Sequence, residues 1–373
     1  MKVTFLTWRD PGHPDGGGSE VYVEEIARRL AARGHEVTVR SAAYAGAPAR
    51  ETVAGVAHRR SGGRLTVYVR GLAHLLTREG RDRDVVVDVI NGLPFASPLL
   101  RRHGVLALVH HLHREQWAII YPDWRGRLGW FVESRVTPLL YRAVPVVTVS
   151  EHSAADLARI GVERARVTVV RNGLDHGRRP PTAPRSTSPR LVVLARLVPH
   201  KQIEHALWVL AQLRAEVPGL RLDVLGDGWW RSHLVDEASR LGVTDCVTFH
   251  GHVDDPTRDE LLATAWVMLL PSVKEGWGIA VTEAAAQGTP TIGYRQSGGL
   301  CESVVDGVTG LLVSDRSELL AATRRLLADD VLRTRLSVEG TRRARLLDWD
   351  DSAERFEEAL GEVGVDRVSG RRR

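Results

Sequence analysis

Short runs of apolar residues alternate along the chain with segments in which apolar residues recur every three or four positions. In the first half, the runs that predict strands are Val3–Thr7, Val37–Ser41, Val85–Ile90, Val105–Val109, Val146–Val149 and Val167–Val170. In the second half, they are Leu191–Ala195, Leu222–Leu225, Val247–His250, Trp266–Leu270 and Thr291–Gly293. Strands that alternate with amphipathic helices are typical of parallel sheets covered by helices on both faces. The pattern predicts an α/β fold with two doubly wound, Rossmann-like domains facing a cleft, with ligands bound beyond the carboxyl ends of the strands.

A polar segment rich in proline, arginine, serine and threonine separates the two series of strands. Because residues 177–189 contain almost no apolar side chain, we expect them to form a linker. We therefore expect an N-terminal domain over residues 1–176, a C-terminal domain over residues 190–349, and a last helix within residues 350–373.

The composition is that of a globular protein. Of the 373 residues, 43% are hydrophobic and 26% are charged, which is ordinary for a chain with two proper cores. No apolar stretch approaches the roughly 18 residues of a membrane span, and the N-terminus predicts a first strand rather than a signal peptide. Cys246 and Cys301 provide no disulfide framework. These features indicate a protein of the reducing cytoplasm.

The positive charge of the chain comes almost entirely from arginine. Lysine and arginine total 51 residues for a net charge of +5, yet Lys2, Lys201 and Lys274 are the only lysines. No dense basic helix with interleaved aromatic residues is present, so we expect no nucleic-acid partner. The scarcity of lysine makes Lys201 and Lys274 notable, because they lie in the two segments with the most function-like patterns.

The window of residues 271–293 contains two glutamates, Glu275 and Glu283, on either side of a tight glycine turn. Gly276 and Gly278 allow the backbone to turn sharply before a helix predicted over residues 279–287. Backbone N–H groups at a helix N-terminus favour an anion such as a diphosphate, while carboxylates beside it can accept hydrogen bonds from ribose and sugar hydroxyls. The pattern predicts a nucleotide-sugar site. Two glutamates at this spacing also occur in ordinary loop–helix junctions. The choice between such a junction and a nucleotide-sugar site therefore depends on the surrounding residues.

Arg196 and Lys201 follow the first strand of the second half. A guanidinium and an ammonium group five residues apart around Pro199 can converge on one diphosphate, the first as a fork and the second as a point charge. A solvated basic turn is the alternative. The position at the carboxyl end of a strand favours the diphosphate.

A glycine cluster, residues 16–18, precedes a helix predicted over residues 21–33. Glycines at such a position let a phosphate approach backbone N–H groups, although a flexible turn has the same composition. The cluster differs from the Gly-x-Gly-x-x-Gly dinucleotide fingerprint, and Ser41 stands where that motif requires an acidic residue. Both features argue against an NAD-type oxidoreductase, which remains an alternative.

Three histidines, His110, His111 and His113, come directly after a buried strand. They raise the question of a metal site. Neighbouring strand residues point in opposite directions, and no carboxylate or cysteine of matching spacing accompanies the histidines. We therefore predict no metal site here.

Taken together, these motifs closely resemble the retaining GT-B-fold glycosyltransferases of family four. Residues 271–290 match the donor-site signature of the family, with Pro-Ser, Glu-Gly-x-Gly, an alanine-rich helix and Gly-x-Pro. Residues 196–201 match its Arg-Leu-x-x-x-Lys-Gly, except that Gln202 replaces the glycine, and residues 171–175 resemble a motif near its hinge. The resemblance extends from residue 3 to about residue 360.

The resemblance implies transfer of a hexose-like sugar from a UDP- or GDP-linked donor to an acceptor hydroxyl, with retention of configuration and with neither metal ion nor cofactor. It places Arg196 and Lys201 at the leaving diphosphate, and His110 and Glu275 near the transferred sugar. The implied donor-binding residues are Gly17, Gly18, Gly226, Gly276, Trp277, Gly278, Ile279 and Glu283. In the family the last helix packs back on the first domain. A non-catalytic nucleotide-sugar-binding homologue would carry the same residues.

No sequence motif identifies the acceptor. An aromatic and basic stretch comprises Trp117, Trp124, Trp130 and Phe131 with Arg125 and Arg127. Its spacing fits a helix that faces the core, which we favour, and also a helix on a membrane surface. Peripheral membrane contact and a lipid acceptor therefore stay open beside a glycan, a natural product or a small metabolite.

Overall fold

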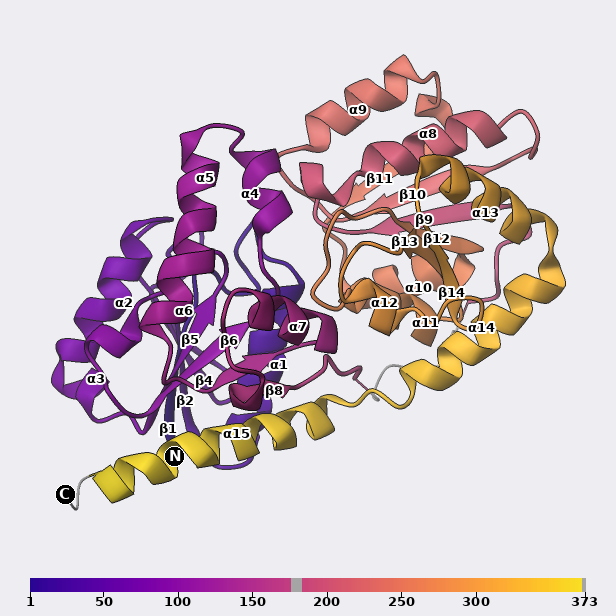
Figure 1. Ribbon diagram of the computed structural model, residues 1–373. Coiled ribbons are helices and arrows are strands. Elements are labelled where there is room, and N and C mark those ends of the chain that lie inside the picture. Colours follow the sequence, from indigo (N-terminus) through magenta and orange to yellow (C-terminus); the bar gives the residue numbers. More distant parts are fainter. Residues whose placement is uncertain (176–182, 371–373) are drawn as a thin grey trace. The chain divides into compact units, whose positions relative to one another are not determined.

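The structure is a computed structural model that describes residues 1–175 and 183–370, with side chains described as far as residue 363. The chain divides into two compact units: unit 1 comprises Met1–Gly173 and Trp349–Arg373, and unit 2 comprises Leu174–Asp348. Each unit is an α/β structure built on one sheet (Figure 1). The predicted fold class, with two parallel-sheet units, is confirmed.

Residues 177–182 of the expected linker lie outside the described residues. The residues that follow are bound to unit 2. Arg185 Nη1 donates to the carbonyl of Ala265 over 2.8 Å, and the indole of Trp266 donates to the carbonyl of Ser186 over 2.8 Å.

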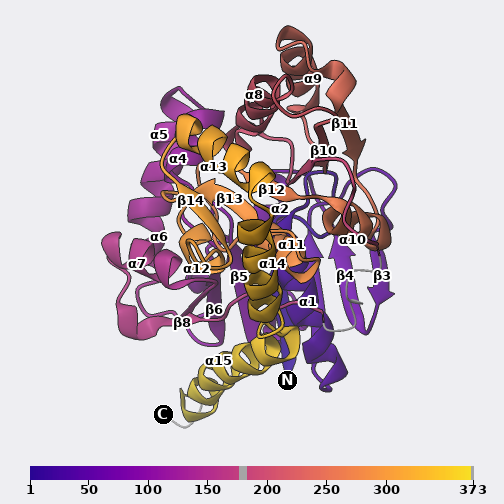
Figure 2. The same cartoon turned by 90° about the vertical axis from the view of Figure 1, so that its right-hand side faces the viewer.

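Unit 1 contains an eight-stranded sheet in the order β3-β4-β2-β1-β5-β6-β7-β8. Every neighbouring pair is parallel except β3 and β4, an antiparallel hairpin at the sheet edge (Figure 2). Its strands are β1 (Lys2–Leu6), β2 (Glu36–Ser41), β3 (Arg50–Val53), β4 (Val56–Arg60), β5 (Val85–Ile90), β6 (Val105–Val109), β7 (Val146–Thr148) and β8 (Val167–Val169).

The helices of unit 1 include the C-terminal helix of the chain. They are α1 (Gly18–Ala32), α2 (Thr66–Leu76), α3 (Arg78–Arg81), α4 (Arg114–Ile120), α5 (Trp124–Phe131), α6 (Thr137–Leu140), α7 (Glu151–Arg159) and α15 (Trp349–Gly370). Helix α15 packs against α1, where Arg29 Nε donates to Asp350 over 2.8 Å. Phe356 stacks on Phe5 of β1 at a ring separation of 5.9 Å, which ties α15 to the core of unit 1.

Unit 2 contains a six-stranded, fully parallel sheet in the order β11-β10-β9-β12-β13-β14. Its strands are β9 (Arg190–Leu194), β10 (Arg221–Leu225), β11 (Val247–Gly251), β12 (Val267–Leu270), β13 (Thr291–Tyr294) and β14 (Gly310–Val313). Its helices are α8 (Ile203–Leu213), α9 (Arg231–Arg240), α10 (Asp255–Thr264), α11 (Ile279–Ala286), α12 (Leu300–Ser303), α13 (Arg316–Ala328) and α14 (Asp330–Ala344).

The strands of unit 2, except the edge strand β11, are largely buried on both faces of the sheet. On β9, Leu191 and Val193 join the core that contains α8 and α13, whereas Val192 joins the core that contains α10 and α11. Apolar runs of this kind are what predicted β9, β10, β12 and β13 from the sequence. All eleven strands expected from the sequence are present; β3, β4 and β14 were missed.

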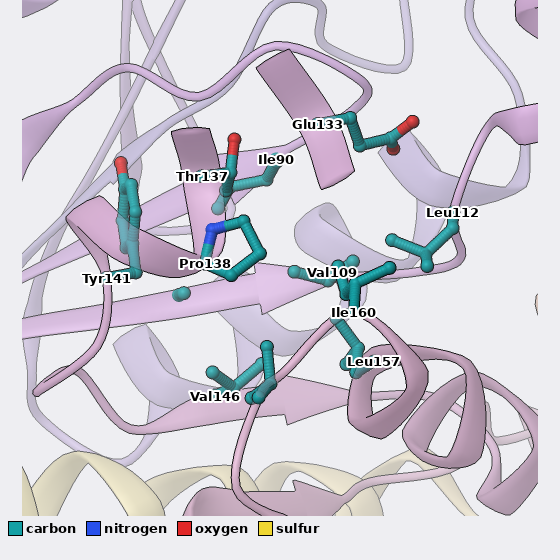
Figure 3. A pocket seen from close by; sticks show the side chains of 12 residues that line it. Ile90, Val109, Leu112, Glu133, Thr137, Pro138, Tyr141, Val146, Leu157 and Ile160 are labelled. Carbon is teal, nitrogen blue, oxygen red and sulfur yellow. The ribbon is translucent and has the colours of Figure 1, made fainter. Parts of the chain in front are cut away.

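A small cavity of about 30 Å³ lies inside the core of unit 1 (Figure 3). Val109 of β6 and Leu157 of α7 line it, with Pro138 and Tyr141 on another side. A space of this size holds at most a water molecule, and its walls are almost wholly apolar. It is a packing void rather than a ligand pocket.

The core interpretation of the aromatic and basic stretch is wrong for two of its residues. Trp124 and Phe131, both on α5, are exposed, while Trp117 and Trp130 are half-buried. Helix α5 approaches α4 through Gly126 and Gly129, so the large aromatic side chains at 124 and 131 lie on its other side. Among the described residues, no helix combines the length and apolarity that crossing a membrane requires.

Candidate active site

The loops that follow β9, β12 and β13 are joined to one another at the carboxyl edge of the unit 2 sheet. The amide of Val273 donates to the carbonyl of His200 over 2.9 Å, and the amide of Glu275 donates to the carbonyl of Ser297 over 2.9 Å. Because parallel strands end at the same edge, segments more than seventy residues apart meet there. This is where ligands bind in open α/β sheets.

Two of the residues expected at the site are in direct contact. Lys201 Nζ donates to Glu275 Oε1 over 2.6 Å, and their side chains are 15% and 11% exposed. Lys201 ends a short 3-10 turn, and Arg196 lies half-buried at the start of the same loop. The structure therefore places a partly sheltered ammonium–carboxylate pair at the edge of the sheet.

Gln202, where the family signature has glycine, adopts the backbone conformation that glycine favours. Its φ and ψ angles are 49° and 41°, in the left-handed region. A side chain in that region costs roughly 1 kcal/mol, so the departure from the signature is absorbed as backbone strain.

Replacing Gln202 with glycine should raise the free energy of unfolding by about 0.5 kcal/mol, because relief of this strain is partly offset by the greater freedom of glycine in the unfolded chain. Urea unfolding measures the change. The matched control is Gln296→Gly, since Gln296 is an exposed loop glutamine without a positive φ. Equal destabilisation by both changes would contradict the assignment of strain.

The glycine turn before α11 is fixed by a buried tryptophan. Trp277 is only 1% exposed, and its indole donates to Thr282 Oγ1 over 3.2 Å. Gly278 has φ +87° and caps α11, which begins at Ile279. Because the Trp277 side chain lies in the core, any contact of this turn with a donor comes from its main chain.

Glu283 lies one turn inside α11 and is buried. Its Oε1 atom is 3.3 Å from Arg258 Nη1 of α10. Arg258 was not predicted as a site residue, because arginine is so abundant in this chain that no signal singled it out. The pair orients the carboxylate that was expected to bind ribose hydroxyls.

Gly226 allows the loop after β10 to approach the end of β9. Its φ is +115°, and a Cβ atom at this position would lie 2.1 Å from the carbonyl oxygen of Ala195. No L side chain fits such a contact with backbone. The glycine at this expected donor-binding position is therefore required by packing.

The Gly-Gly loop after β13 is hydrogen-bonded to the main chain of Glu275. This contact was not predicted from the sequence. The amide of Gly299 donates to the carbonyl of Glu275 over 2.9 Å. A Cβ atom at Gly298 would lie 2.9 Å from that carbonyl and 3.0 Å from Lys274 Cε. The backbone of Glu275 is thus bonded on both sides to residues 297–299.

In unit 1, the glycine loop is organised by the buried carboxylate of Glu20. Gly17 N donates to Glu20 Oε2 over 2.8 Å, so the Glu20 side chain caps the start of α1. Arg9 Nη2 donates to Glu20 Oε1 over 3.0 Å, and both side chains are nearly inaccessible to solvent. Gly17 and Gly18, expected at the donor, therefore form the N-terminus of α1.

His110 is buried at the end of β6, with the ring of Tyr22 packed edge-on at 5.1 Å. Within the described residues, its Nε2 atom is buried without a hydrogen-bond partner. Burial lowers the pKa of His110 to about 4, although Glu20 opposes the shift. The imidazole is therefore neutral at pH 7.

This histidine should make the protein less stable as the pH falls from about 6.5 to about 4. The unfolded chain binds the proton first, because the folded pKa is the lower one. The stabilisation is thus fully present above the unfolded pKa and decreases below it, by up to about 3 kcal/mol. Urea unfolding at several pH values gives the free energy of unfolding as a function of pH. Between pH 6.5 and pH 4 this free energy should fall less steeply for His110→Asn than for the wild type. The exposed His103→Asn is the control, and an unchanged slope in His110→Asn would contradict the prediction.

Of the other two histidines, His113 contacts a buried carboxylate, and the ring of His111 packs on that of His113 at 4.4 Å. His113 Nδ1 is 2.8 Å from Glu133 Oε1, and the indole of Trp117 donates to Glu133 Oε2 over 2.9 Å. Glu133, twenty residues further along the chain, was not predicted as a partner of His113, because sequence spacing does not reveal this contact. In the part of the chain that the structure describes, no three His, Cys, Asp or Glu side chains form a group that could hold a metal ion.

Comparison with known proteins places both units in one enzyme class. A family model described as "Glycosyltransferase Family 4" matches residues 16–178, and one described as "Glycosyl transferases group 1" matches residues 178–343. A glycogen synthase from Mycobacterium tuberculosis is 28% identical over 94% of this chain and 91% of its own length. A D-inositol 3-phosphate glycosyltransferase from Thermomonospora curvata is 28% identical over 93% of this chain and 90% of its own length.

Solved structures show the same fold. The sucrose-phosphate synthase from Thermosynechococcus elongatus matches 98% of this chain and 100% of its own, with a TM-score of 0.84 and 21% identity. HepE from Anabaena, solved in complex with UDP-glucose, matches 97% of this chain and 100% of its own, with a TM-score of 0.77 and 18% identity. The two family models together span nearly the whole chain, and the chain therefore belongs to the GT-B glycosyltransferases of family four.

Proposed function

We propose that the protein transfers a hexose-like sugar from a nucleoside-diphosphate donor to an acceptor hydroxyl, with retention of configuration and without a metal ion. The observation that carries the proposal is the pair of Lys201 and Glu275 at the carboxyl edge of the unit 2 sheet. The complexes of HepE with UDP and with UDP-glucose support a nucleotide-sugar donor and favour uridine over guanosine.

The cations of the β9 loop act on the leaving group. Negative charge grows on the diphosphate as the bond to the sugar breaks, and Lys201 stabilises that charge in a partly sheltered position. Arg196, on the same loop, is the second cation. The N-terminal amides of α11, which start at Ile279, supply further donors.

The two carboxylates recognise hydroxyl groups. Glu275 accepts hydrogen bonds from the sugar, and its backbone bonds to residues 297–299 hold it in place. Glu283, oriented by Arg258, accepts hydrogen bonds from the ribose. Carboxylates accept from hydroxyls without a metal ion between them.

His110 is proposed to contact the transferred sugar. Because its pKa is lowered to about 4, the imidazole acts at pH 7 as a neutral hydrogen-bonding group rather than as a cation. The leaving diphosphate itself accepts the proton of the acceptor hydroxyl. This scheme needs no covalent intermediate on the protein.

A binding panel tests the donor site. UDP, GDP, ADP, TDP and NAD are titrated without metal against the wild type and Lys201→Ala. We expect one nucleoside diphosphate to bind selectively and to bind more weakly to the variant. Binding of NAD alone would favour the alternative function, an NAD-type oxidoreductase. Binding of a nucleotide sugar without any turnover across an acceptor screen would favour the non-catalytic homologue.

Two further measurements test the chemistry. Once a donor is known, nuclear magnetic resonance identifies the anomer of the first product, and an inverted anomer would refute retention. Activity should persist in excess chelator, and its loss would refute metal independence. We also propose a cytoplasmic location, in keeping with the free cysteines Cys246 and Cys301; fractionation of producing cells tests it.

A further inference from the structure

Helices α5 and α6 carry a row of large apolar side chains on their solvent side. The two helices are joined through the π-turn Val132–Val136 and form one continuous column (Figure 1). The row, called here the outer stripe, consists of Trp124 (67% exposed), Leu128 (50%), Phe131 (56%), Val136 (39%) and Leu139 (69%). Its members recur every three to five residues, which places them along one side of the column.

The fully buried positions of the same column are small or polar, while Trp130 and Leu140 pack half-buried against the apolar core of unit 1. A Cβ atom at Gly129 would lie 2.6 Å from the ring of Trp117, and one at Gly126 would lie 2.0 Å from the carbonyl of Tyr121. Glu133 and Thr137 are also buried. An ordinary surface helix buries its apolar side and exposes its polar side. This column does the reverse at its fully buried positions, and the large apolar residues of the outer stripe are not covered by the packing of unit 1.

The surroundings of the outer stripe are positively charged. Within residues 114–142 all five arginines are exposed: Arg114, Arg125, Arg127, Arg135 and Arg142. Of the three acidic residues in the same segment, Glu133 is buried, and Glu115 and Asp123 are exposed. Asp123 pairs with Arg125 over 2.9 Å. The exposed part of the segment therefore has a net positive charge.

We propose that the outer stripe docks on the surface of a bilayer that contains anionic lipids. The apolar side chains enter the headgroup region, while the arginines extend along it to the lipid phosphates. A second copy of the chain is a poor occupant, because two positive faces would repel each other. The inference rests on the surface of unit 1 and does not depend on the proposed sugar transfer.

Vesicle flotation of the full chain tests the proposal. The vesicles contain phosphatidylcholine alone, or phosphatidylcholine and phosphatidylglycerol in equal parts. We expect binding to the anionic vesicles, weakened by salt. The variant Trp124→Gln/Leu128→Gln/Phe131→Gln should lower the partition constant for the anionic vesicles by about tenfold or more. The reason is that the variant lacks three apolar side chains whose transfer from water into the bilayer favours binding.

A matched variant makes the same type of change elsewhere. Val331, Val338 and Leu346 of unit 2 are exposed apolar residues, and their replacement by glutamine should leave partitioning unchanged. Arg125→Gln/Arg127→Gln/Arg135→Gln should lower binding to the anionic vesicles only. Thermal unfolding confirms that each variant folds.

Three results would overturn the proposal. The first is a wild type that does not float with the anionic vesicles. The second is an equal loss of binding in the stripe variant and the unit 2 variant. The third is a wild-type oligomer, seen by light scattering, that the stripe variant converts to monomer, which would make the stripe an interface between copies.

Discussion

Replacing Lys201 with alanine should lower kcat by about a hundredfold or more, while the acceptor KM changes by less than about threefold. The ammonium group opposes charge that develops on the leaving diphosphate only as the transition state forms. It is held 2.6 Å from Glu275 in a partly sheltered position, where a charge interaction is stronger than in water. Steady-state kinetics with a donor identified by the binding panel measures the effect.

Removing Lys201 also leaves the Glu275 carboxylate without this partner, so stability and turnover must be separated. Lys201→Arg keeps a positive charge and should retain more turnover than Lys201→Ala. The matched control is Lys2→Ala, which removes an exposed ammonium that pairs with Asp82 at the surface and should change neither quantity. A drop in acceptor affinity at unchanged kcat would contradict the proposed role of Lys201.

The sequence located most strands from their apolar runs, but it missed the short strand β14 and the edge hairpin of β3 and β4. Val56, His58 and Arg60 of β4 point inward, so two of its three buried side chains are polar. They face charged tertiary partners: Arg60 Nε donates to Asp10 over 2.5 Å, and His58 Nε2 lies 3.5 Å from Glu24. A strand whose buried side chains are polar and charged does not show the alternation of apolar and polar residues from which strands are predicted. The edge hairpin was therefore invisible to the apolar pattern.

The same limit applies to the site. Lys201 and Glu275 were singled out because they lie in family motifs at the ends of apolar runs. Arg258 stands in a helix with no such pattern, and its partnership with Glu283 exists only because α10 and α11 pack together. The bonds that hold Glu275 to residues 297–299 are made by main-chain atoms, which the identities of side chains do not reveal.

Replacing Glu20 with alanine should lower the free energy of unfolding of the protein by about 3–5 kcal/mol. The change leaves the Arg9 guanidinium buried beside an empty position and removes the acceptor of the Gly17 amide. An unpaired buried charge costs far more than a lost surface contact, because neither water nor a counter-charge replaces the partner. Urea unfolding followed by circular dichroism measures the loss.

A double-mutant cycle separates the charge pair from the rest of the loop. Arg9→Ala/Glu20→Ala should be less destabilised than the sum of the two single variants, because it leaves neither charge buried alone. Additive losses would mean that the 3.0 Å contact does not couple the two side chains. Glu20→Gln should fall between the wild type and Glu20→Ala, since an amide oxygen can still accept from the Gly17 amide while the charge is gone. The order of these variants thus distinguishes the electrostatic contribution of Glu20 from its contribution as the cap of α1.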